Sequence, residues 1–319
     1  MNVLITGIAG QDGFFLAQEA SRLGWNITGT KLPQETLSIG YPEDKFIVKN
    51  LDFSNTENVK SFVETLDSLD LVFHLAGRSS VAESWKNPYD YFQVNSLGSI
   101  TLMQNVLNSF PNCKIILAGS AEIFDPLAEL PWDSLTRKAP TNPYGLSKLL
   151  MYEYGKKLKD DNYWVSTAFL FNHESPRRSM NFLSKKIVSA VGQIHLGNPK
   201  IIELENLESL RDWGYAPEYM QALVQLSQLS EPTDVAIGTG KLSSVRDFLS
   251  SAFLEIGISD WSKMVTVSAS STIGTSKHYC DTNEAESKIG WRATTLMPEL
   301  ARLLVRSEIN EILKTRNEQ

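Results

Sequence analysis

The sequence predicts an α/β fold, with a doubly wound parallel sheet followed by a smaller C-terminal lobe. Short apolar runs typical of buried strands alternate with longer segments of helical spacing. A glycine-rich turn joins the first of these strands to the first helix. Beyond residue 172 the alternation becomes irregular, which indicates a second structural unit. Such alternation is typical of parallel sheets covered by helices on both faces.

The first strand is expected at residues 3–5, because an apolar run ends there directly before the glycine turn. Further apolar or β-branched runs predict strands at residues 26–29, 46–48, 71–75, 114–118 and 164–169. Helical spacing predicts helices at residues 14–23, 57–66, 91–110 and 144–158. In the second part of the chain, helices are predicted at residues 182–191, 217–228, 245–254 and 297–313.

Composition and charge argue against several classes of function. The 319 residues carry a formal charge of −7, which predicts no basic field for nucleic acid. The apolar runs are too short for a membrane span, and the N-terminus has no features of a secretion signal. Two cysteines, Cys113 and Cys280, fit a reducing cytoplasm, where we expect the protein to act. Histidines and cysteines match no zinc spacing, so we expect no metal site.

Glycines recur at every third position between the first strand and the first helix, at Gly7, Gly10 and Gly13. Glycine permits a tight turn and lets the backbone approach a pyrophosphate, whose charge meets the helix N-terminus. Gln11 and Asp12 lie in the same turn and are predicted to bind the cofactor with it. The position of this turn favours dinucleotide binding over the alternative, a plain strand-to-helix turn.

The end of the second strand indicates which dinucleotide binds. An acidic residue there would select NAD, but this chain has Lys31, which can pair with a 2′-phosphate. NADP is therefore favoured over NAD, and the alternative is a solvent-exposed lysine. Asp52 follows the third strand and can accept a hydrogen bond from the adenine amino group. Leu75, Ala76 and Gly77 end the fourth strand and should leave room for the cofactor.

These features predict a Rossmann-like NADP-binding domain over residues 1–171. Residues 172–319 should form mainly a substrate-binding lobe over the carboxyl ends of the strands, where open α/β sheets bind ligands. No linker-like segment separates the cofactor-binding domain from the substrate-binding lobe in the sequence. It therefore stays open whether the chain crosses back to the sheet.

The candidate catalytic groups begin with Tyr144 and Lys148, which lie on one face of a predicted helix. The nearby cation is expected to lower the pKa of the phenol, so that Tyr144 can take a proton from a sugar hydroxyl. Lys148 can also hold the ribose hydroxyls of the cofactor. Ser120 follows the fifth strand and can orient the substrate oxygen. The alternative is a helix-capping serine with a surface tyrosine and lysine.

Glu122 extends this chemistry beyond the oxidation of an alcohol. A carboxylate two residues after Ser120 can act on a neighbouring carbon of the same sugar. Once a ketone exists, the proton on the adjacent carbon is acidic, and a glutamate can remove it and help to expel a hydroxyl one carbon further on. The alternative is a surface glutamate in a loop.

The chain resembles the extended short-chain dehydrogenase/reductase superfamily and, within it, the GDP-mannose 4,6-dehydratase family. The resemblance covers most of the length. The segments that carry it are TGIAGQDG at 6–13, SAE at 120–122, PYGLSK at 143–148, FNHESPRR at 171–178 and RDWG at 211–214.

The resemblance implies an internal redox reaction on a nucleotide-activated hexose, GDP-mannose. Tyr144 and Ser120 would take the 4-hydroxyl to a ketone while hydride passes to NADP. Glu122 would then remove the C5 proton, water would leave from C6, and the hydride would return to C6. The product would be a 4-keto-6-deoxy sugar.

The resemblance also supplies expectations about substrate contacts and assembly. Asn172, Lys185 and Arg211 would contact the sugar nucleotide, and Arg211 can grip a diphosphate bidentately. The alternative for Arg211 is an ion pair with Asp212 or another carboxylate. The superfamily further implies a homodimer, formed by the helices predicted at residues 91–110 and 144–158, with a tetramer as the larger alternative.

The sequence departs from the family pattern at three places. Ser120 and Ala121 stand where the family has threonine and serine, so one hydroxyl is lost. The arginine-rich stretch that binds NADP and joins subunits is replaced by the short segment KLPQET at 31–36. Residues 271–274 contain neither the arginine nor the glutamate that help to hold the nucleotide. The identity of the base therefore stays open.

Two other functions remain open from the sequence. A 4-ketoreductase or epimerase on the same sheet would make Glu122 dispensable. A cofactor-binding protein without catalysis would keep its role after Tyr144→Phe. The complete set of Ser120, Glu122, Tyr144 and Lys148 favours the dehydratase.

Overall fold

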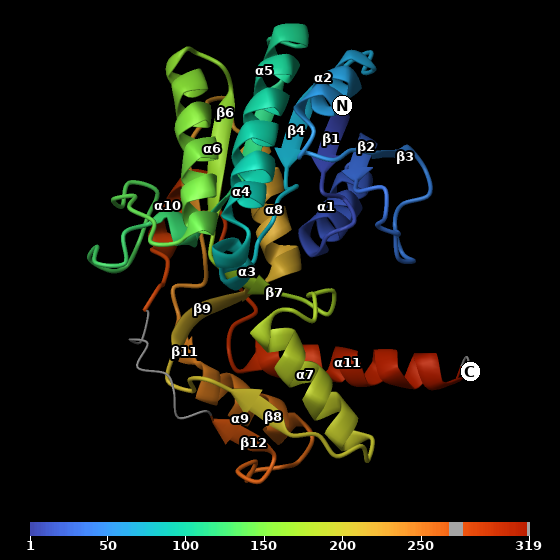
Figure 1. The fold of residues 1–319 in the computed structure, drawn as a ribbon, viewed down its shortest axis with the longest axis vertical. Coiled ribbons are helices and arrows are strands. Elements are labelled where there is room, and N and C mark those ends of the chain that lie inside the picture. The colour runs from blue at the N-terminus through green and yellow to red at the C-terminus, as the bar shows by residue number, and fades with distance from the viewer. Residues whose placement is uncertain (268–276, 318–319) are drawn as a thin grey trace.

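The computed structural model describes residues 1–267 and 277–317 and contains a central sheet of seven strands in the order β10-β6-β5-β4-β1-β2-β3 (Figure 1). All six neighbouring pairs are parallel. The predicted α/β class with a doubly wound parallel sheet is confirmed. The strands are β1 (Asn2–Thr6), β2 (Asn26–Lys31), β3 (Phe46–Asn50), β4 (Leu71–His74), β5 (Lys114–Ser120), β6 (Val165–Leu170) and β10 (Val235–Ile237).

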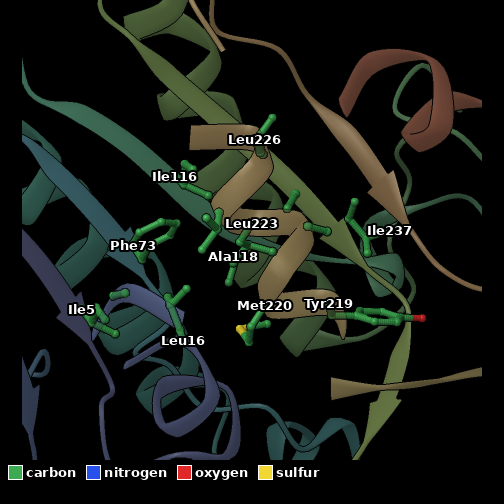
Figure 2. Close-up of a cluster of buried hydrophobic side chains, with 14 of the residues drawn as sticks. Ile5, Leu16, Phe73, Ile116, Ala118, Tyr219, Met220, Leu223, Leu226 and Ile237 are labelled. Carbon is green, nitrogen blue, oxygen red and sulfur yellow. The ribbon is translucent and has the colours of Figure 1, made fainter. Parts of the chain in front are cut away.

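Helices cover both faces of this sheet. On one face, Val3 and Ile5 of β1 belong to a core shared with α1 (Gln11–Arg22) and α8 (Ala216–Ser227). Figure 2 shows α8 side chains, among them Met220 and Leu223, packed against this face. On the other face, Leu4 packs with α2 (Thr56–Glu64), α5 (Ser99–Ser109) and α6 (Pro143–Asp160). Successive β1 residues thus face opposite cores, as a strand buried on both sides requires.

The helix predicted over residues 91–110 is helical but not uniform. It consists of α4 (Pro88–Tyr91), a π-helix η1 (Phe92–Gly98) and α5. The predicted long helix is confirmed, and the π-helical part at residues 92–98 is a feature that the spacing did not predict. The π-helix buries Asn95, whose amide donates 3.0 Å to the hydroxyl of Ser147 in α6. π-helical turns occur often at functional sites.

The chain returns to the large sheet after building part of the smaller lobe. β10 pairs with β6, and α8 packs on α1, although both follow residue 172. α10 (Thr282–Ile289) lies beside β10, and the short helix α3 (Val81–Lys86) follows β4 (Figure 1). The sequence patterns predicted neither α3 nor α10, because both are short.

The smaller lobe is built at the carboxyl end of the sheet, since β7 begins directly beyond the end of β6 (Figure 1). Its core lies among three helices and includes Val191, Trp213, Phe248 and Leu304. None of the helices within residues 1–267 and 277–317 has the length and apolar composition of a membrane span. The lobe comprises α7 (Leu183–His195), α9 (Val245–Glu255), α11 (Glu299–Asn317), β7 (Asn172–Glu174), β8 (Ile202–Leu204), β9 (Leu210–Tyr215), β11 (Leu242–Ser244) and β12 (Val265–Val267).

Candidate active site

The glycine turn between β1 and α1 is packed closely against the end of β4. Gly7 has a positive φ of 71°, and a Cβ at this residue would lie 2.9 Å from the backbone nitrogen of Ala76. A Cβ on Gly13 would lie 2.5 Å from the carbonyl oxygen of Gly7. Gly10 is the N-cap of α1 and provides no side-chain cap, so the first N–H groups of the helix can bind an anion. This cradle fits a pyrophosphate.

The turn lies at the point where the strand order reverses, between β1 and β4. Open α/β sheets bind ligands in the crevice at such a point. The hydroxyl of Thr6 accepts from the N–H groups of Leu75 at 3.1 Å and Ala76 at 3.0 Å. A Cβ on Gly77 would lie 3.5 Å from the ammonium of Lys148. The structure thus brings the predicted cofactor residues of β1 and β4 next to the predicted catalytic lysine.

Lys31 and Asp52 are predicted to bind the adenosine half of the cofactor. Lys31 is the last residue of β2, and Asp52 follows the end of the neighbouring strand β3. The Lys31 ammonium donates to the carbonyl oxygen of Glu35 at 2.6 Å and to the side chain of Asn50 at 3.1 Å. Asp52 accepts from the backbone nitrogen of Ser54 at 2.8 Å. If Lys31 binds a 2′-phosphate, its ammonium must first give up these hydrogen bonds to Glu35 and Asn50.

Gln11 and Asp12 are held by the segment that follows β6. Asp12 contacts the imidazole Nε2 of His173 at 3.0 Å, and Gln11 accepts from the Ser175 hydroxyl at 2.7 Å. Burial acts to raise the pKa of Asp12, but the charge and hydrogen bond of His173 lower it to about 2. Burial acts to lower the pKa of His173, but the charge and the hydrogen bond of Asp12 raise it above its usual value. The cofactor turn is thereby attached to the motif that begins the smaller lobe.

Ser120, Tyr144 and Lys148 converge at the carboxyl end of β5. Ser120 ends the strand, and its side chain lies close enough to the Tyr144 phenol to act on its pKa. α6 starts at Pro143, with Asn142 as its N-cap, which places Tyr144 in the first turn. Lys148 lies one turn later and donates 2.8 Å to the carbonyl oxygen of Ala118 in β5. The predicted groups are therefore brought together.

The predicted lowering of the Tyr144 pKa by Lys148 is wrong. Burial raises the pKa of Tyr144 to about 12, although the hydrogen bond from Ser120 and the charge of Arg178 act to lower it. Burial also lowers the pKa of Lys148 to about 8. Helical spacing correctly predicted that the two residues share a face, but burial has the largest effect on the pKa of each.

Glu122 lies beside this cluster, in the short 3-10 helix η2 (Ala121–Ile123) that follows β5. Its carboxylate accepts 2.9 Å from the amide of Asn142, and its backbone nitrogen donates 3.2 Å to the Ser120 hydroxyl. The charge of Glu122 acts on the pKa values of both Tyr144 and Arg211. The carboxylate of Glu122 therefore lies within electrostatic range of both the Tyr144 phenol and the Arg211 guanidinium.

The three predicted substrate contacts lie at different places in the smaller lobe. Asn172 is exposed in β7 and pairs with Trp213 of β9, the strand that also carries Arg211. Burial lowers the pKa of Arg211 while Glu122 raises it, so this guanidinium lies near the catalytic cluster. Lys185 instead forms an ion pair with Glu308 of α11 and donates 3.0 Å to Pro176. Residues 271–274, where the sequence lacks the arginine and the glutamate expected to help hold the nucleotide, lie outside the described residues.

Sequence reasoning did not assign roles to Asn142, His173 and Arg178. Asn142 could have been found, because an asparagine before a proline is a typical helix N-cap. Arg178 pairs with Glu174 at 3.1 Å, and its charge lowers the pKa values of Asp12 and Tyr144. The contact of His173 with Asp12 reaches across the fold and has no local sequence signal, whereas Arg178 pairs with a residue only four positions away.

A family model described as GDP-mannose 4,6 dehydratase matches residues 4–304. The human GDP-mannose 4,6 dehydratase is 30% identical over 98% of this chain and 92% of its own length. The GDP-mannose 4,6-dehydratase of Sordaria araneosa is 31% identical over 98% of this chain, which spans 62% of that protein's length.

Among solved structures, RMD from Pseudomonas aeruginosa, complexed with NADPH, superposes with a TM-score of 0.80. The match covers 97% of this chain and 99% of the other at 17% identity. At this level of identity the similarity supports the fold, and the family model carries the assignment of the family.

Proposed function

The chain belongs to the GDP-mannose 4,6-dehydratase family, and on this premise we propose that it is an NADP-dependent hydro-lyase that converts GDP-mannose to GDP-4-keto-6-deoxymannose. The matched family segment contains every residue of the cluster around Tyr144. A nucleotide-activated hexose is the substrate class, and water is the leaving group.

Tyr144 and Ser120 act at the sugar 4-hydroxyl. When bound, NADP would supply the acceptor for the C4 hydride and, once reduced, the donor of a hydride for C6. Ser120 orients the hydroxyl, and the ionised form of Tyr144 takes its proton, so that a ketone forms at C4; the positive charge of a bound nicotinamide would favour that form over the buried phenol. Lys148, one turn along α6, faces the end of β4, where it can hold ribose hydroxyls.

Glu122 performs the elimination. With a ketone at C4, the C5 proton becomes acidic, and the Glu122 carboxylate removes it. The same proton can then be delivered to the 6-hydroxyl, which leaves as water. When the hydride is added to C6, C5 must regain a proton, which Glu122 can deliver after taking one from solvent, while the proton held by Tyr144 returns to solvent. Asn142 donates to this carboxylate and keeps it beside Ser120. The contact between these two segments supports a single site for both proton transfers.

We assign cofactor binding to residues 1–171 and substrate binding mainly to residues 172–319, with Asn172 and Arg211 on the nucleotide sugar. The guanidinium of Arg211 can bind a diphosphate bidentately. The ion pair of Lys185 with Glu308 supports a more remote role for that lysine.

One observation carries this proposal: Glu122 is hydrogen-bonded both to Ser120, through its backbone nitrogen at 3.2 Å, and to Asn142, the N-cap of the helix that carries Tyr144, through its carboxylate at 2.9 Å. The direct test incubates the purified protein with a panel of nucleotide-activated hexoses. We expect GDP-mannose to lose the mass of one water without net consumption of NADP. Reduction or inversion of a sugar without loss of water would favour a ketoreductase or an epimerase instead.

Replacing Lys31 by alanine is expected to weaken NADP binding about tenfold and to leave NAD binding nearly unchanged, as expected for one charge-assisted hydrogen bond to the 2′-phosphate. Fluorescence titration with NADPH and NADH measures the two affinities. Lys49→Ala is the matched control, because Lys49 is an exposed lysine on the neighbouring strand. Equal losses for both cofactors would contradict this role for Lys31.

We further propose a homodimer formed by α6 and the helical segment that contains η1. Leu97 of η1 and Leu146 and Leu150 of α6 are 50%, 42% and 50% exposed. Leu146 and Leu150 lie on one face of α6, four residues apart. Exposed leucines on packed neighbouring helices support an interface between two copies.

Leu150→Glu should convert the dimer to a monomer at micromolar concentration, because it places a charge in the proposed interface. Sedimentation equilibrium measures the mass. Leu127→Glu is the control, since Leu127 is 88% exposed outside these helices. A dimer that persists in Leu150→Glu would exclude this interface.

The proposed compartment is the cytoplasm. Cys113 and Cys280 are both buried free thiols, which agrees with a reducing environment.

A further inference from the structure

Five buried polar side chains connect the cofactor turn to the helix that carries Tyr144. Each is fully buried. They come from β1, β4, η1, α5 and α6, and we call them the buried polar chain: Thr6, His74, Asn95, Ser99 and Ser147. Fully buried polar groups are costly unless each hydrogen-bonding atom has a partner.

Hydrogen bonds connect the members of the buried polar chain in turn, and at Asn95 the connection passes from the backbone carbonyl to the side-chain amide of the same residue. Thr6 Oγ1 and His74 Nδ1 lie 2.8 Å apart, and His74 Nε2 and Ser99 Oγ lie 2.7 Å apart. Ser99 donates 2.7 Å to the carbonyl oxygen of Asn95. The Asn95 amide donates 3.0 Å to the Ser147 hydroxyl, which itself donates 2.7 Å to the carbonyl oxygen of Tyr144.

These contacts determine where each proton lies. The Ser99 hydrogen points to Asn95, so the Ser99 oxygen accepts from His74 Nε2–H. His74 Nδ1 then carries no proton and accepts from the Thr6 hydroxyl. The Thr6 oxygen uses its two lone pairs for the N–H groups of Leu75 and Ala76.

His74 is therefore a neutral connector and not an acid or base. A second proton on its ring would leave the Thr6 hydroxyl hydrogen without an acceptor. Burial and the charge of Lys148 lower the pKa of His74 to about 3, in agreement with this arrangement. Phe53 packs against the imidazole, with ring centroids 5.0 Å apart.

The two ends of the chain meet different parts of the candidate active site. Through Thr6, one end fixes the backbone of Ala76, which the cofactor turn contacts at Gly7. The other end, Ser147, lies next to Lys148 and binds the carbonyl oxygen of Tyr144. A displacement of about 1 Å between reacting groups can cost about a hundredfold in rate.

We propose that His74 and Ser99 are positioning residues, which hold the Tyr144 helix in register with the cofactor turn. This inference rests on the proposed dehydratase function, because it concerns the same two sites. Ser99 is the decisive link, since its removal separates the ends while Thr6–His74 and Asn95–Ser147 remain bonded.

Ser99→Ala should lower kcat about tenfold and leave the KM values for GDP-mannose and NADP within about twofold, because each half of the site stays intact. Ser99→Thr keeps the hydroxyl and should restore most of kcat. The control is Ser166→Ala in β6, a fully buried serine whose hydroxyl accepts 2.9 Å from the backbone of Thr233. This control should lower Tm as Ser99→Ala does but keep the wild-type kcat.

A second measurement does not depend on turnover. The ring-nitrogen NMR shifts of His74 should show the neutral Nε2–H tautomer at neutral pH. An imidazolium or the Nδ1–H tautomer would overturn the inference, as would a Ser99→Ala variant that loses stability but keeps the wild-type kcat. Failure of the proposed function would appear in the wild-type protein itself, as absence of water loss from GDP-mannose.

Discussion

Tyr144→Phe is expected to lower kcat for the dehydration of GDP-mannose by about 10²–10⁴-fold, the usual contribution of a positioned general base. The change removes only the phenolic oxygen, which lies close enough to Ser120 for that side chain to act on its pKa. The ring itself is kept, together with its edge-to-face contact with Tyr91 at 6.2 Å. We therefore expect little change in Tm or in NADP affinity. Turnover is measured as formation of the keto sugar by mass spectrometry.

Tyr152→Phe is the matched control for this experiment. Tyr152 lies two turns further along α6, is equally buried, and packs against Phe169 at a centroid distance of 5.1 Å. Its hydroxyl has no place in the proposed reaction, so kcat should stay near the wild-type value. A Tyr144→Phe enzyme with wild-type turnover would remove Tyr144 from the mechanism and leave cofactor binding as the function to explain.

Most elements of the large sheet could be predicted from the sequence, because short apolar runs and the glycine turn are local signals. β4, for example, is fully buried, and its first three residues, 71–73, are an apolar run. The pairing of β10 with β6 was not predictable in this way. β10 has three residues and lies far along the chain from its partner, so its place depends on tertiary packing.

In the candidate site, too, features that depend on residues close in sequence could be predicted, and features that depend on distant segments could not. The spacing of Tyr144 and Lys148 is local, and the structure confirms that they share a helix face near Ser120. The pKa of Tyr144 depends on burial by segments distant in sequence, and here the prediction had the wrong sign. Lys185 pairs with Glu308, 123 residues away, a contact that no motif encodes.

Glu122→Gln is expected to abolish exchange of deuterium into C5 of the sugar and to lower kcat for water loss by about 10²–10⁴-fold. An amide has nearly the shape of the carboxylate but cannot take the C5 proton. Glutamine can still accept from Asn142 through its carbonyl oxygen, as the carboxylate does at 2.9 Å. NADP affinity should not change, because Glu122 lies in η2, outside the glycine turn.

Glu129→Gln tests whether any loss is specific. Glu129 is exposed and lies beyond η2, so its neutralisation should leave both exchange and turnover at wild-type levels. If C5 exchange persists in Glu122→Gln, another group removes the proton and the elimination step assigned to Glu122 is wrong. If exchange stops while oxidation at C4 continues, the enzyme separates its two proton transfers between Tyr144 and Glu122. That result would distinguish a dehydratase from an epimerase, since inversion at C4 requires no base for C5.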